Sequence, residues 1–146
     1  MLPRKYRVHA ALILICLVII FLPRYMEKPD KEKAQLAKAA TARFLQLLDA
    51  DKYAESWQTS ASLLKDKVAE DKWVELLKKN RSLLGPLVKR QQKEISYSTT
   101  ATDSPEGEYI LIIYDSTFQR KPGASEIVTV MLDKDKSWRV AGYFIK

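Results

Sequence analysis

An apolar run near the start of the chain constrains its architecture more than any other feature. Residues 8–22 read VHAALILICLVIIFL, with basic side chains on both sides of the run. A bilayer core needs about 20 apolar residues, and interfacial tyrosines and snorkelling arginines extend a shorter segment. Tyr6, Tyr25, Arg7 and Arg24 are placed to do this. We therefore expect a single transmembrane helix over residues 8–25, with a cytoplasmic tail over 1–7.

The residues after this run favour a retained anchor over a removable signal peptide. Signal peptidase requires small side chains beyond the apolar run. From Leu17 to Lys33 there is no Ala, Gly or Ser. Lysines and arginines are similarly frequent on both sides, so the charge count alone leaves the orientation open. The dense basic cluster before residue 8 resembles a signal n-region, which favours an uncleaved signal-anchor with the domain outside the cytoplasm.

The remaining residues predict a neck over 26–33 and one domain over 34–146. That length suits a single domain with its own core. Cys16, the only cysteine, lies inside the apolar run, so the domain has no disulfide. Without Arg4, Lys5 and Arg7 the net charge of +7 falls to +4, an excess too mild to indicate nucleic-acid binding.

Helical periodicity comes first along the domain. Apolar spacing predicts one helix over 30–49, opened by Asp30, and a second over 51–64, capped by Asp51. A third is expected over 70–84, because Gly85 and Pro86 form a helix stop. We therefore expect three helices.

Alternating patterns follow over 95–100, 109–118, 125–132 and 137–145, separated by short segments rich in turn formers. Short connections imply an antiparallel meander. The predicted fold class is α+β, with three helices packed on a four-stranded antiparallel sheet.

Residues that carry chemistry are few. His9, the only histidine, lies at the edge of the apolar run, and no carboxylates have metal-ligand spacing, so we expect no metal, no cofactor and no catalytic residue. The four glycines are scattered, which excludes a glycine-rich phosphate loop. Asp115 is the one candidate base: burial within its apolar strand would raise its pKa, whereas a solvent-facing position would leave it an ordinary surface group.

Two further groups of residues have a functional and a structural interpretation. Aromatic side chains either build the core or line an apolar pocket between sheet and helices. The pocket candidates are Tyr53, Trp57, Trp73, Tyr114 and Tyr143. A basic cluster either suits a helix C-terminus and solvent, or forms a surface patch for anionic lipid or an acidic protein partner. Its members are Lys78, Lys79, Arg81, Lys89, Arg90 and Lys93.

Four stretches carry a resemblance to a known family: residues 47–65, 81–90, 105–118 and 126–146. Together, and in this order, they resemble the family known as domain of unknown function 4019, with the YAESW block and the WRVAGYFI ending the most specific. Ten residues match its recurring pattern: Asp49, Tyr53, Trp57, Trp73, Gly85, Gly107, Tyr109, Trp138, Gly142 and Tyr143.

The resemblance implies a small exported bacterial protein, with the domain in the periplasm and the anchor in the inner membrane. It also implies a fold similar to the cystatin-like and nuclear-transport-factor-like cones, and it supplies no catalytic residue. Two departures stand out. Lys136 occupies the place of a hairpin glycine, and Val68 and Ala69 occupy the place of a helix-capping serine.

Three functions remain open at this point. The first is a non-enzymatic, membrane-anchored accessory or protein-interaction module. The second is a binder of a small apolar ligand in a pocket between sheet and helices. The third is a cone-fold enzyme that uses Asp115 as its base, with Tyr114 or Tyr143 as hydrogen-bond donor.

Overall fold

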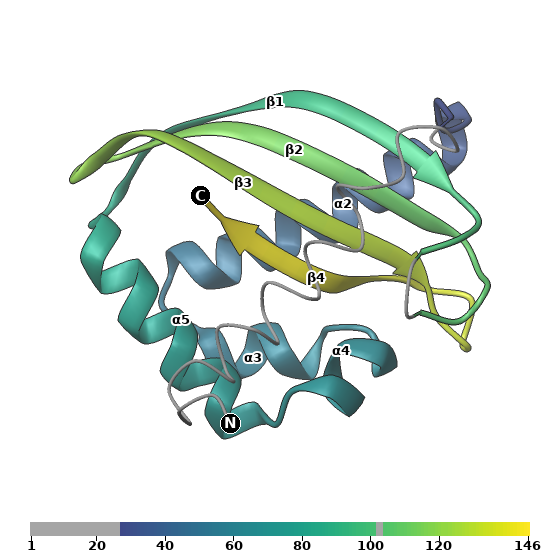
Figure 1. Ribbon diagram of the computed structural model, residues 1–146, viewed down its shortest axis with the longest axis horizontal. Coiled ribbons are helices and arrows are strands. Elements are labelled where there is room, and N and C mark those ends of the chain that lie inside the picture. Colours follow the sequence, from purple (N-terminus) through teal and green to yellow (C-terminus); the bar gives the residue numbers. More distant parts are fainter. Residues whose placement is uncertain (1–26, 102–103) are drawn as a thin grey trace, which may run out of the picture.

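The computed structural model describes residues 27–101 and 104–146. In these residues four helices precede a four-stranded sheet, which confirms the α+β class (Figure 1). In these two ranges no helix has the length and apolar character needed to cross a membrane. The predicted tail, the anchor over 8–25, Cys16 and His9 all lie outside the described residues.

Helix α2 (Lys31–Asp49) begins and ends where the sequence predicts. The side chain of Asp30 accepts a hydrogen bond from the backbone N–H of Lys33 at 2.9 Å, which satisfies a free donor of the first turn. One stripe of the helix is buried, including Phe44 and Leu48. This stripe packs across the sheet, against β2, β3 and β4.

The predicted second helix is wrong, because two helices occupy its place. These are α3 (Tyr53–Gln58) and α4 (Ser62–Lys67). Between them Ala61 is extended, and its N–H donates to the carbonyl of Val140 in the sheet at 2.8 Å. This tertiary bond interrupts the helical pattern. Asp51 is not the cap: it adopts a positive φ of 59°, and its carboxylate accepts a hydrogen bond of 2.7 Å from the hydroxyl of Tyr53.

Helix α5 (Glu70–Leu84) confirms the third predicted helix. Gly85 ends it with a φ of 74°, a conformation that glycine adopts without strain, and its N–H donates to the carbonyl of Arg81. At the other end, Ala69 occupies the cap position and provides no side-chain hydrogen bond.

The strands are β1 (Leu87–Ser98), β2 (Tyr109–Phe118), β3 (Lys121–Leu132) and β4 (Trp138–Ile145). They form an antiparallel meander in the order β1-β2-β3-β4, as predicted. Strand β1 starts well before the predicted position, because its first half is an exposed edge without apolar alternation. In the β3–β4 turn Lys136 takes a φ of 66°, in the left-handed region that favours glycine.

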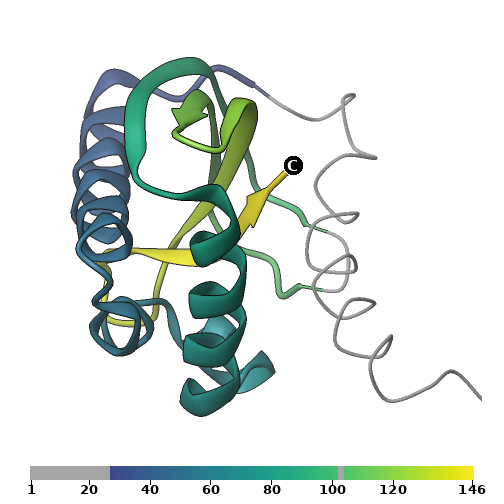
Figure 2. The same cartoon turned by 90° about the vertical axis from the view of Figure 1, so that its left-hand side faces the viewer.

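The core lies between the helices and one face of the sheet (Figures 1 and 2). Phe44 packs edge-on against Tyr143 and obliquely against Trp73, with ring centroids 5.5 and 6.2 Å apart. At the far end of β1, Glu27 pairs with Tyr97 through two backbone hydrogen bonds of 2.6 and 2.8 Å. The start of the described chain is therefore fixed to the sheet edge.

Candidate functional site

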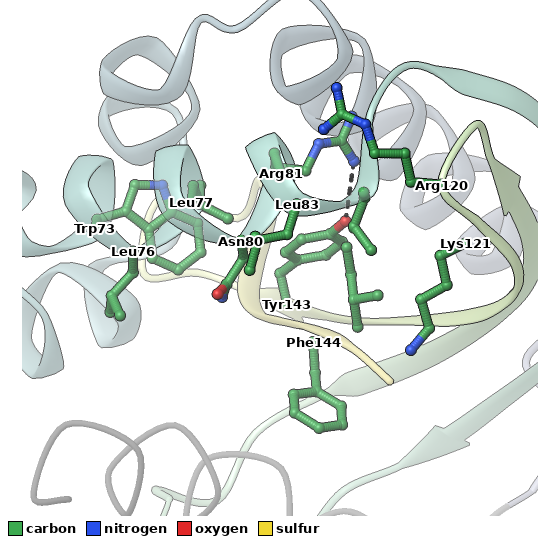
Figure 3. Close-up of a pocket in the computed structure, with 12 residues that line it drawn as sticks. Trp73, Leu76, Leu77, Asn80, Arg81, Leu83, Arg120, Lys121, Tyr143 and Phe144 are labelled. Carbon is green, nitrogen blue, oxygen red and sulfur yellow. Dashed lines mark hydrogen bonds between the residues drawn. The ribbon is translucent and has the colours of Figure 1, made fainter. Parts of the chain in front are cut away.

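A cleft of about 750 Å³ lies between helix α5, the edge strand β4 and the β2–β3 hairpin (Figure 3). Its volume falls in the range of small-molecule sites, about 300–1,000 Å³. The lining residues are Trp73, Leu76, Leu77, Asn80, Arg81, Leu83, Leu84, Arg120, Lys121, Tyr143, Phe144 and Ile145. Most of them are apolar; apart from Asn80 on the exposed side of α5, the polar ones lie on the floor and at one end.

Helix α5 supplies an apolar wall along the cleft. The helical period places Trp73, Leu77 and Arg81 on the buried stripe, while Leu76 and Leu83 lie on the adjacent, more exposed side. Trp73 is held in place, because its indole N–H donates to the buried hydroxyl of Ser56 at 3.0 Å. Leu83 is 67% exposed, so a large apolar side chain at the cleft has little protein packed against it.

The floor of the cleft is polar and nearly closed to solvent. Arg81 and Tyr143 are 7% and 6% exposed, and the guanidinium donates to the tyrosine oxygen at 3.3 Å (Figure 3). The same guanidinium lies over the ring of Phe118, 5.0 Å from its centre, a cation–π contact. The floor is therefore rigid.

Beneath the floor lies a fully buried carboxylate. Glu126 is 0% exposed on β3 and accepts hydrogen bonds from Arg90, Ser116 and Tyr143, the first from Nε at 2.7 Å. Arg81 approaches the same carboxylate to 3.7 Å. A buried charge is stable only when it is paired and hydrogen-bonded, and this one is.

Asp49 completes the network from the last residue of α2. A carboxylate is unfavourable at a helix C-terminus, but Arg90 donates to it with two nitrogens, at 2.7 and 3.0 Å, and Arg81 also binds it. Partial burial would raise the pKa of Asp49, but the hydrogen bonds from the two arginines outweigh this and lower it below its ordinary value. We call Asp49, Arg81, Arg90, Ser116, Glu126 and Tyr143 the buried charge network.

Tyr143 is the point at which this network meets the cleft. Burial, together with the negative charge of Glu126, raises the pKa of Tyr143 well above 10. Its hydroxyl therefore stays neutral in ordinary conditions. It serves as a donor to Glu126 and an acceptor for Arg81.

One end of the cleft is basic. Arg120 and Lys121, from the β2–β3 hairpin, flank the cleft on the side away from Trp73 and Leu76 (Figure 3). Arg120 donates one hydrogen bond to the carbonyl of Ser82. Within ranges 27–101 and 104–146, neither cation forms an ion pair. The cleft thus has an apolar wall along α5 and a positive charge at the end away from Trp73.

The structure brings together two of the five predicted aromatic residues. Trp73 and Tyr143 line the cleft, while Tyr53, Trp57 and Tyr114 do not. The hydroxyl of Tyr53 donates to Asp51, and burial together with this bond raises its pKa to about 12. The indole of Trp57 donates to the carbonyl of Val68 at 2.8 Å. Tyr114 lies on β2, partly buried, with a pKa raised by burial.

The predicted basic patch is divided by the structure. Lys78 and Lys79 on α5, and Lys89 and Lys93 on β1, are exposed. Arg81 and Arg90 are instead held in the buried charge network, with side chains 7% and 14% exposed. These two arginines therefore belong to the interior and not to a lipid-facing surface.

Asp115 lies in the environment that the surface interpretation anticipated. Its side chain is 62% exposed and forms an ion pair of 3.6 Å with the equally exposed Lys93. It borders only a shallow depression of about 310 Å³ near the β2–β3 hairpin. The burial that would have made it a candidate base is absent.

Sequence reasoning missed the residues that give the cleft its polarity. Glu126 shares strand parity with Val128 and Val130, both fully buried, and this was the signal that it faces the core. Arg120 and Lys121 lie in a segment that was interpreted only as a turn. Among the described residues no three His, Cys, Asp or Glu side chains are grouped to hold a metal.

Comparison with known proteins yields one match. No curated protein and no solved structure matches the chain. The model of the family described as "Protein of unknown function (DUF4019)" matches residues 40–143, a range that includes Asp49, the cleft-lining part of α5 and Tyr143. This chain therefore belongs to the DUF4019 family of proteins of unknown function.

Proposed function

We propose that this chain is a non-enzymatic accessory module, held at the outer face of the bacterial inner membrane by residues 8–25, which binds an apolar ligand in the cleft. The observation that carries the binding part is the cleft itself, an open, largely apolar space with exposed Leu83 at its edge. Apolar side chains left without a protein partner in a concave site are typical of ligand recognition. The exposed carboxylate of Asp115 gives no support to the enzyme alternative.

The experiment uses three tryptophans as internal reporters. Of Trp57, Trp73 and Trp138, Trp73 alone lines the cleft. The ¹⁵N-labelled full-length protein in phosphatidylcholine nanodiscs is titrated with octanol at free concentrations fixed by dialysis. We expect a saturable shift of the Trp73 indole signal, with the other two indole signals unchanged.

Two neighbouring positions on α5 provide a matched pair of variants. Asn80 lines the cleft and Lys79 does not, although both are exposed. Asn80→Phe should fill the space and abolish the shift, whereas Lys79→Phe should leave it intact. A Trp73 signal that does not respond to octanol, or responds equally in both variants, would refute ligand binding in the cleft.

The membrane part of the proposal rests on the apolar run and is tested separately. The intact protein should sediment with membranes, resist carbonate extraction and retain its N-terminus in mass spectrometry. A mature chain that begins near Pro29 or Ala34, found in the soluble fraction, would overturn it. The cone-shaped topology implied by the resemblance stays a prediction, supported by the order of helices and strands.

A protein partner is the second candidate, and one observation favours it. Leu83 and Val88 are 67% and 66% exposed on either side of the α5–β1 turn. Exposed apolar side chains near one another favour a contact surface. A partner crosslinked to the full-length protein should be lost on Leu83→Ser plus Val88→Ser, and retained on Leu36→Ser, which alters an exposed leucine of α2. Equal recovery from all variants would exclude this surface.

A further inference from the structure

We propose that the occupant of the cleft is a single-chain amphiphile with a terminal carboxylate, such as a medium-chain fatty acid, bound with its head at Arg120 and Lys121. This inference rests on the proposed function and names the ligand class for the same site. Its basis is the arrangement of chemistry in the cleft: apolar side chains line it along α5, and two cations without an ion-pair partner in the described residues stand at the end away from Trp73.

The apolar wall fits an alkyl chain. Trp73, Leu76 and Leu77 belong to it, and the lining of α5 extends from Trp73 to Leu84, a length of about 16 Å at 1.5 Å per residue. Figure 3 shows Trp73 and Leu76 at one end of the cleft and Lys121 at the other. A flexible chain of medium length can lie along this wall with its head beside the hairpin.

The basic end fits a carboxylate. The other arginine that lines the cleft, Arg81, is already paired, because it binds Asp49 and lies close to Glu126. Arg120 and Lys121, by contrast, have no acidic partner in the described part of the chain. An anionic head would supply that charge, with hydrogen bonds stronger than those of a neutral head.

The position of the cleft favours a ligand that arrives from the aqueous phase and not a headgroup of the bilayer. The hairpin that carries Arg120 pairs with the start of β1, and Glu27 pairs with Tyr97 near its end. At about 3.3 Å per residue, the ten steps along β1 from Leu87 to Tyr97 place the two sites about 30 Å apart. Glu27 is the end of the described chain nearest the predicted anchor, so the basic end of the cleft lies far from that attachment.

The test compares three ligands that carry different polar head groups on chains with the same number of carbon atoms. Octanoate, octanol and octyltrimethylammonium are titrated in turn into the nanodisc-embedded full-length protein, and the Trp73 indole shift is followed. We expect octanoate to bind about tenfold more tightly than octanol, and the cation more weakly than either. Raising the salt concentration should reduce the octanoate preference and leave octanol binding unchanged.

Charge variants then locate the head. Arg120→Gln plus Lys121→Gln should reduce the affinity for octanoate to that for octanol, without affecting octanol itself. Lys134→Gln plus Lys136→Gln, in the exposed β3–β4 turn, removes the same charge elsewhere and should change neither.

Each outcome separates this inference from the proposed function. Equal affinity for octanoate and octanol would overturn the carboxylate inference and leave apolar binding standing. Failure of all three ligands to shift Trp73 would refute both. A Trp73 shift that depends on protein concentration without any ligand would assign the cleft to a second copy of the chain. A preference for octanoate that persists in the Arg120 and Lys121 variant would place the head elsewhere.

Discussion

The buried charge network and the cleft share Arg81 and Tyr143, yet they depart from ordinary protein architecture in opposite directions. The network places two arginines and the carboxylate of Glu126 in the interior, with the partly exposed Asp49 at its edge, and every one of these charges has a partner. The cleft leaves apolar side chains such as Leu83 open to solvent. Folding explains the first departure completely, because the charges satisfy one another. The second has no structural explanation within the fold, and it is therefore the better indicator of function.

The largest effect on stability is expected from removing the carboxylate of Glu126, at the centre of the buried charge network. Glu126→Gln should lower the free energy of unfolding by about 3–5 kcal/mol, because it removes the fully buried anion of the network and leaves Arg81 and Arg90 to share Asp49 alone. Urea unfolding of the full-length protein provides the measurement. As a control, Asp115→Asn removes an exposed ion pair and should cost less than about 1 kcal/mol. Similar losses for both variants would show that the network is not specially dependent on its charges.

A second test follows how the contribution of Asp49 to the free energy of unfolding depends on pH. Its pKa is lower in the folded protein than the ordinary 3.8, so its stabilising contribution is complete above that value and is lost as the pH falls through the folded pKa. At pH 7, Asp49→Asn should cost about 2 kcal/mol, since two arginines lose a partner that remains partly exposed. The difference from the parent protein should shrink towards pH 2 in urea unfolding. A difference that stays constant with pH would contradict the pairing.

A third test replaces Tyr143, which belongs to both the buried charge network and the cleft. Tyr143→Phe should cost about 1–2 kcal/mol at pH 7, because Glu126 loses a hydrogen bond. Its pKa is raised in the folded state, so its contribution is complete below 10 and is lost as the pH rises towards the folded pKa. The parent should therefore lose stability above pH 10 by an increment that the variant lacks. If octanol still shifts Trp73 in the variant, the cleft does not depend on the hydroxyl.

The smallest effect on stability is expected at the cleft edge. Leu83→Ser should change the free energy of unfolding by no more than about 0.5 kcal/mol, because the side chain is 67% exposed. It should nevertheless weaken octanol binding severalfold in the Trp73 titration. Leu36→Ser, at a leucine that is 50% exposed on α2, should leave both quantities unchanged. A large loss of stability on Leu83→Ser would indicate that this side chain supports the fold instead.

The parts of the fold that the sequence predicted are those with a strong local signal. Asp30 opens α2 and Gly85 closes α5 through bonds to residues a few positions away. The break between α3 and α4 has no such signal, because it depends on the bond from Ala61 to Val140, which is distant in the sequence. The early start of β1 was missed for a related reason, since its first half is mostly exposed and polar and carries no apolar alternation, and Arg90, whose side chain turns inwards there, is charged.

The candidate site was harder to predict because it arises from long-range packing. Trp73 and Tyr143 were chosen as polar-tipped aromatics, and both reach the cleft. Tyr53 and Trp57 are also aromatic residues with a polar tip, but hydrogen bonds to Asp51 and to the carbonyl of Val68 hold them outside the cleft. Arg81 and Arg90 lie in a run of cations, and only their carboxylate partners, far away in the sequence, draw them inside. A residue-type pattern does not encode such pairings.

The distribution of the network over the chain limits how the cleft can move. Its members come from α2, α5 and all four strands, so each of these elements is needed before the charges are neutralised. Swinging α5 outwards would pull the Arg81 guanidinium away from both carboxylates. The helix therefore cannot act as a hinged gate. A ligand must thus enter a cleft whose shape is already set before binding. The protein then loses little conformational entropy when the ligand binds.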